Sequence, residues 1–186
     1  MRKIFFCFTF LCAFTEVFGQ KIAVKTNLLY DITSTLNIGM EVKLSPILTI
    51  DVSGNYNPFT FNDTKKLKHW LIQPELRYWF CEVFNGHYVS IHSLTGEFNV
   101  SDMNLLVYPS FKGNRYQGKL YGTGLGYGYQ IIIGKRWNLE LGIGLGWIRA
   151  LYDKYDCPKC GKWLSSDKKN YFGITKAGIS LVYIIK

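Results

Sequence analysis

Histidine, proline and acidic side chains are scarce in this chain of 186 residues. It holds 3 histidines, 5 prolines and 13 acidic residues against 22 basic ones, a formal net charge of +9. The histidines are scattered and only one C-x-x-C pair is present, so a zinc site has little support, and we expect no cofactor or metal. After residue 19 the sequence has no apolar run of about 18 residues or more, which argues against a membrane-spanning helix.

Aromatic residues and glycine are abundant instead. The chain has 13 tyrosines, 13 phenylalanines, 5 tryptophans and 18 glycines, and 48% of it is hydrophobic. That hydrophobic content excludes a disordered chain. Aromatic residues favour strands and glycine disfavours helices, so an all-β fold in a single domain is expected rather than a helical bundle.

The first 19 residues have the pattern of a secretory leader. Arg2 and Lys3 precede an apolar run over residues 4–14, and Val17 and Gly19 occupy the positions of a small-residue cleavage site. We therefore expect a signal peptide over residues 1–19 and one β-domain over residues 20–186. Export without a membrane helix leaves the periplasm, the medium or the outer membrane as destinations.

Eight segments read as strands: residues 22–30, 36–44, 49–56, 71–80, 87–98, 119–133, 137–152 and 171–185. The connections after the second, fourth and sixth are short, and those after the third, fifth and seventh are long. Short turns on one side and long loops on the other are typical of outer-membrane barrels, whose short turns are periplasmic. The pattern predicts an eight-stranded antiparallel up-and-down transmembrane β-barrel in the outer membrane.

Alternation within the strands supports this prediction. Leu139, Leu141 and Ile143 fall on one face of the seventh segment, while Glu140 and Gly142 fall on the other. An apolar outer face with a small and polar inner face fits a membrane barrel. A soluble lipocalin-like barrel with its apolar face inward is the alternative.

The same parity places four acids and four bases inside the barrel. Because an eight-stranded barrel is only wide enough for its own side chains, we expect these charges to form a closing network of ion pairs. A proton or ion path through them is the alternative. The eight residues are Lys25, Glu41, Lys43, Asp51, Glu75, Arg77, Glu140 and Lys176.

Large aromatic side chains gather near the predicted strand ends, where they fit the girdles of a membrane barrel. Platforms for stacking sugars are the alternative. The predicted long loops carry a basic excess, which suits the phosphates of lipopolysaccharide; nucleic acid is a poor partner for an exported chain. The girdle candidates are Tyr30, Tyr56, Trp70, Trp79, Phe80, Trp137, Trp147 and Tyr152.

Two groups of residues could carry chemistry instead of a purely structural role. Cys157 and Cys160 form a C-x-x-C pair that we read as a loop disulfide, with a redox pair or half a zinc site as alternatives. Cys81 stands alone as a free thiol. Ser90, His92 and Glu97 resemble the constellation of lipid A hydrolases, but parity directs Ser90 and His92 inward and Glu97 to the opposite face. We therefore expect the protein to have no enzymatic activity.

The chain resembles a Bacteroidota family filed as a domain of unknown function and treated as small outer-membrane β-barrels of the OmpA/OmpX-like class. The resemblance implies a structural or interaction role, since the family has no assigned reaction and some relatives accompany fimbrial or OmpA-like surface systems. A lipid A-modifying enzyme and a narrow solute or ion channel remain alternatives. The matching stretches are residues 25–31, 56–61, 66–70, 73–82, 115–118, 135–140, 152–161 and 169–173.

Overall fold

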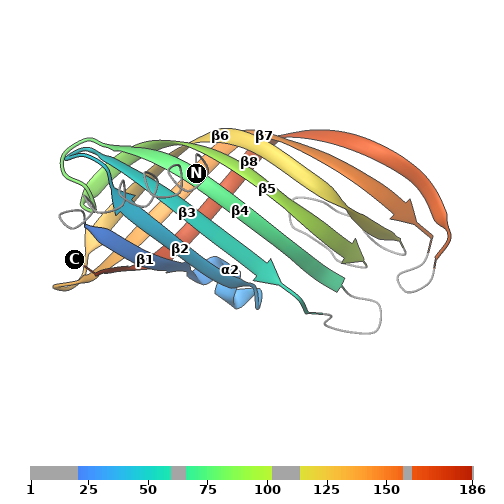
Figure 1. Cartoon of the computed structure of the whole chain (residues 1–186), viewed down its shortest axis with the longest axis horizontal. Helices are drawn as coiled ribbons and strands as arrows, with labels where there is room; N and C mark the ends of the chain where they lie inside the picture. The colour runs from blue at the N-terminus through green and yellow to red at the C-terminus, as the bar shows by residue number, and fades with distance from the viewer. Residues whose placement is uncertain (1–20, 60–65, 102–113, 157–160, 186) are drawn as a thin grey trace, which may run out of the picture.

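Eight antiparallel strands form a closed ring in the computed structural model, which describes residues 21–59, 66–101, 114–156 and 161–185. Each strand pairs with the next, and the last pairs with the first, so the topology is up-and-down as predicted (Figure 1). No helix within the described part of the chain is long and apolar enough to cross a membrane. The elements are β1 (Ile22–Asn27), α2 (Leu28–Ile32), β2 (Leu36–Lys43), β3 (Leu48–Asn57), β4 (Lys66–Trp79), β5 (Gly86–Ser101), β6 (Arg115–Ile132), β7 (Trp137–Tyr155) and β8 (Trp163–Ile184).

Several strand ends differ from the prediction. β4 begins at Lys66 rather than at residue 71, β6 begins at Arg115 rather than at residue 119, and β8 begins at Trp163 rather than at residue 171. All three expected long connections are therefore partly strand. β1 is shorter than expected because the Asn27 side chain caps the short helix α2. The amide of Leu29 donates to Asn27 Oδ1 at 3.1 Å.

The ring has one slanted rim. β1 has 6 residues, whereas β8 has 22. β8 pairs with β1 through residues 180–184, and over residues 163–179 its partner strand in the described structure is β7 alone. β6, β7 and β8 consequently reach well past β1 and β2, at the right of Figure 1. The rim with the short turns and both described ends of the chain lies opposite.

The two faces of the ring have opposite polarity, as the parity predicted. Along β7, Asn138 and Glu140 are buried in the interior, whereas Leu141 and Ile143 are exposed on the outside. Apolar side chains with large exposed fractions also lie on the outer face of other strands, with Ile91 at 61% and Leu125 at 67%. An inward apolar face, as in a lipocalin-like barrel, is therefore not the arrangement of this chain.

Paired glycines on β6 and β7 widen the interior. Gly126 faces Gly144, and Gly128 faces Gly142, across the two strands. A Cβ atom on Gly128 would lie 2.3 Å from Cζ of Tyr88, far inside van der Waals contact. The glycines thus leave the space that large side chains of β5 occupy.

An apolar plug closes the interior at the short-turn rim. The turn between β4 and β5 folds inward and buries Val83 and Phe84 against Trp79 and Tyr88. Asn138 holds this turn by donating to the Phe84 carbonyl oxygen at 2.8 Å. Trp79 is fully buried, so its assignment to a membrane girdle was wrong: its place on β4 directs it inward. Sequence reasoning did not find the plug.

Candidate functional site

Arg77, near the end of β4, is the centre of a buried cluster of charges inside the ring. Its guanidinium forms a bidentate ion pair with Glu140 of β7, Nη1 to Oε2 at 2.7 Å and Nη2 to Oε1 at 3.0 Å. It also contacts Glu41 at 2.8 Å, Glu75 at 3.1 Å and Asp51 at 3.6 Å. One cation thus joins carboxylates from four strands.

Two lysines complete the cluster from the other side of the ring. Lys25 Nζ lies 3.1 Å from Asp51 Oδ2, 3.3 Å from Glu41 Oε2 and 3.5 Å from Glu140 Oε1. Lys176, on β8, contacts Glu75 directly and lies 3.7 Å from Asp51. β1 and β8 therefore connect to β2, β3, β4 and β7 through side chains as well as through the sheet.

Register explains why a cluster forms here. Glu41, Asp51 and Glu75 lie directly opposite one another on β2, β3 and β4. Like charges in such cross-strand positions repel one another, so the arrangement depends on the three cations that reach into the row. All seven side chains are buried or nearly so.

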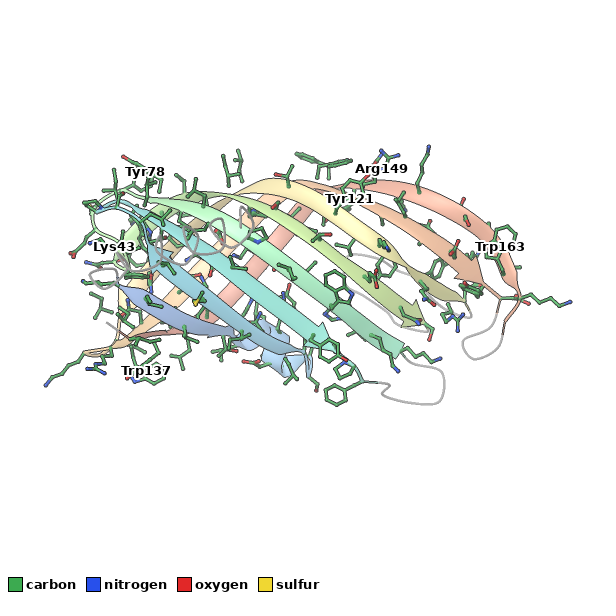
Figure 2. The ribbon with its side chains drawn as sticks, viewed as in Figure 1. Lys43, Tyr78, Tyr121, Trp137, Arg149 and Trp163 are labelled. Atoms are coloured by element: carbon green, nitrogen blue, oxygen red, sulfur yellow. The ribbon has the colours of Figure 1, made fainter. Side chains whose placement is uncertain are left out.

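Lys43 is not part of this cluster, although it was predicted to be. It is half-buried, faces Thr49, and forms no ion pair with any described residue. Lys43 is the last residue of β2, at the short-turn rim (Figure 2), where a long side chain can extend its ammonium toward water. The formal charge of the cluster is therefore −1, from four acids and three bases, rather than neutral.

Hydrogen bonds and ring contacts join the charge cluster to the apolar plug. Thr49 donates to Glu41 Oε1 at 2.6 Å and receives a hydrogen bond from Trp79 Nε1 at 2.9 Å. The ring of Tyr88 lies 4.4 Å from the guanidinium carbon of Arg77 and 4.8 Å from the ring of Trp79. The polar network and the plug thus form one continuous packed body.

Little space remains around the cluster. A cavity of about 20 Å³ lies between Lys25, Glu140 and Lys176, which is room for about one water molecule. A much larger hollow, of about 1050 Å³, opens at the slanted rim and is lined by His69, Phe98 and other residues of β3 to β8. The interior is therefore open at the slanted rim and filled with side chains from the charge cluster to the short-turn rim.

The structure does not bring the three hydrolase-like residues together. His92 lies inside the ring, where its Nε2 is 2.8 Å from Oγ1 of Thr175. Ser90 is also interior, but its hydroxyl has no hydrogen-bond partner among the described residues. Glu97 lies on the outer face, where it accepts from Trp70 at 3.3 Å and pairs with Lys119 at 3.4 Å. The acid and the histidine are thus separated by the wall of the ring.

The cysteine predictions have different outcomes. Cys81 is a free, exposed thiol in the turn after β4, as predicted. Cys157 and Cys160 lie outside the described residues, and their expected disulfide stays a prediction. The same holds for the expected signal peptide over residues 1–19.

Comparisons with protein families, curated proteins and solved structures place the chain in a family. A family model described as a protein of unknown function (DUF3575) matches residues 4–185. No curated protein and no solved structure matches the chain.

Proposed function

The chain belongs to the DUF3575 family, and from its structure we propose that it is an outer-membrane β-barrel with a closed polar interior. In this proposal it has a structural or interaction role at the cell surface and no enzymatic activity. Outer-membrane lipid, lipopolysaccharide and a surface or fimbrial protein are its proposed partners.

The observation that carries the proposal is the polarity of the two faces. Buried charges lie in the interior, while exposed apolar side chains form a band around the outside of the ring. Soluble proteins rarely expose large continuous apolar surfaces, because exposing them to water is costly. Lipid contact removes that cost. Residues of the outer band include Ile38, Met40, Ile50, Leu76, Ile91, Leu125, Ile143 and Ile179.

Aromatic side chains mark both edges of this band. On the outside of β7, Trp137 packs on Tyr183 at 4.8 Å between ring centroids, and Trp147 packs on Tyr121 at 6.0 Å. The two tryptophans are ten residues apart on one strand. At about 3.3 Å per residue and a tilt of about 40°, they differ in height by about 25 Å, which is the usual height of the apolar band of outer-membrane barrels.

Above Trp147 the outer face becomes polar. The next outward positions of β7 are Arg149, Leu151 and Asp153, and the β8 residues above Phe172 are Asn170 and Lys168. This change supports a sheet that projects beyond the bilayer on the long-loop side, which we place outside the cell. The edge of β8 over residues 163–179 faces no strand that the structure describes other than β7, and such an edge is suited to an added partner strand, a common mode of peptide recognition.

The packed interior favours a structural role over transport. Ion pairs occupy the middle of the ring and the apolar plug occupies the short-turn end, so neither region leaves an open path. The separation of Glu97 from Ser90 and His92 likewise disfavours a lipid-cleaving enzyme. These arrangements support the proposed closed barrel over the channel and enzyme alternatives.

A charged substitution on the outer band tests the membrane placement. Ile143 is 51% exposed and lies near the middle of the band, so Ile143→Arg costs almost nothing in water but about 2–4 kcal/mol in a bilayer. Leu151 is 42% exposed above Trp147, and Leu151→Arg is the matched control. In a Gram-negative host we expect the outer-membrane fraction to lose the Ile143 variant and retain the control. Equal accumulation of both variants in a soluble fraction would contradict the proposal.

A further inference from the structure

Three cations on the outer face of β6, β7 and β8 lie directly above the line of aromatic residues. Arg149 faces Tyr121 on one side and Asn170 on the other, while Leu151 faces Lys119 and Lys168. Arg149 is therefore the diagonal neighbour of both lysines, at a distance of about 7–8 Å between backbones. The two lysines are two strands apart, or about 10 Å. Figure 2 shows Arg149 and Tyr121 on the outer surface.

Two of these cations have no acidic partner in the described part of the chain. Arg149 and Lys168 form no ion pair with any residue that the structure describes, and Arg149 Nε is buried without a hydrogen-bond partner. Lys119 pairs with Glu97, which is also held by Trp70. Among the described residues, the other acid on this part of the outer face is Asp153, which lies one row higher and accepts hydrogen bonds from Ser166 and Trp163. The group therefore has a positive excess.

The surface below the cations is strongly apolar. Phe172 is 80% exposed, Leu145 is 54% exposed and Ile174 is 51% exposed on β7 and β8. Trp147 lies between Leu145 and Arg149 on the outer face of β7. Cations above an exposed apolar surface match an amphiphile that has anionic groups above its acyl chains.

We propose that Arg149, Lys119 and Lys168 bind the phosphates of a bisphosphorylated glycolipid of the lipid A type, with its acyl chains on the surface below. Cations on three neighbouring strands span more than one phosphate group, which fits a disaccharide with a phosphate at each end better than a phospholipid with one. The long-loop side, where these residues lie, is the side that faces the outer leaflet. This inference rests on the proposed membrane placement.

Binding of defined lipids to the purified full chain in detergent micelles tests the site by native mass spectrometry. The probes are bisphosphorylated lipid A, its dephosphorylated form and phosphatidylglycerol. We expect lipid A to bind best, and the variant R149Q/K168Q to bind it at least about tenfold more weakly, since charge-assisted hydrogen bonds are lost. The control K135Q/R136Q removes one lysine and one arginine from the turn between β6 and β7, at the opposite rim, and should bind like the wild type.

The outcomes separate this inference from the proposed function. Three results would overturn the glycolipid site. These are an equal loss of lipid A binding in both double variants, equal binding of lipid A and its dephosphorylated form, and a preference for phosphatidylglycerol. If the wild-type chain inserts into the outer membrane and shows one of these results, the membrane placement stands and the site alone is wrong. If the chain does not insert, both are wrong.

Discussion

Arg77 of β4 and Glu140 of β7 form a bidentate ion pair across the interior of the ring, with contacts of 2.7 and 3.0 Å. The two strands are not neighbours in the sheet, so this pair joins opposite sides of the wall. The backbone hydrogen bonds of the sheet join only neighbouring strands. The crossing pair adds a constraint on the shape of the ring, and its loss should therefore affect the whole fold.

Arg77→Met should strongly destabilise the protein. The substitution leaves four buried carboxylates with two lysines, and breaking a buried ion pair in this way costs about 3–5 kcal/mol. Urea unfolding in lipid vesicles, followed by tryptophan fluorescence, measures the loss. Arg136→Met, at an exposed turn, is the control and should change the free energy of unfolding by less than about 0.5 kcal/mol. An equal effect of the two substitutions would show that the cluster contributes nothing specific.

The glycines of β6 provide a second prediction. Gly128→Ala brings a methyl group to 2.3 Å from the Tyr88 ring, whereas a Cβ on Gly54 of β3 meets no atom within 4 Å. We expect Gly128→Ala to cost about 1–3 kcal/mol, as for other overpacked interiors, and Gly54→Ala to be nearly neutral. The same urea titration compares them. Tyr88→Ala should relieve the clash, so the double variant G128A/Y88A should show strong coupling; additive costs would contradict the packing.

Most of the charge cluster could be predicted from the sequence because strands alternate with a period of two. Once Leu139 and Leu141 face outward, Glu140 must face inward, and the same reasoning places Arg77 and Lys176. Which carboxylate meets which cation depends on how the strands are staggered around the ring, and alternation does not encode that stagger. Lys43 shows the difference: its parity is correct, but its height in the ring leaves it outside the cluster.

Other features carried no periodic signal. Residues 163–170 of β8 are polar or exposed on both faces. The alternation of apolar and polar residues therefore does not extend over this part of the strand, and the sequence did not predict it. The plug depends on a turn that folds inward, and Phe84 has a backbone φ of 64°, in the left-handed region that non-glycine residues rarely adopt. Asn27 did carry a recognisable capping preference, yet its position within an apolar segment favoured continuation of the strand.

The closed interior predicts that the protein does not conduct ions. Reconstituted into planar bilayers, the wild-type chain should show no steady openings. Phe84→Ala should also remain silent, because it removes part of the plug and leaves the ion pairs around Arg77 in place. If Phe84→Ala conducts and the wild type does not, the plug alone closes the interior. Steady channels in the wild type would instead favour the ion path considered from the sequence.

The position of His92 predicts that it acts in packing rather than in catalysis. Its ring fills the space above Gly124 and Gly144 and contacts Thr175 at 2.8 Å, inside a wall that separates it from Glu97. Ser90→Ala and His92→Gln should therefore leave the lipid A of an expressing host unchanged, as read by mass spectrometry. His92→Gln should still cost about 0.5–1.5 kcal/mol in urea unfolding, the usual net value of one hydrogen bond, and Ser90→Ala, whose hydroxyl is unpartnered, should cost less. Loss of an acyl chain from lipid A in the wild type, restored by either substitution, would instead establish a hydrolase and require the strands around His92 to open toward lipid.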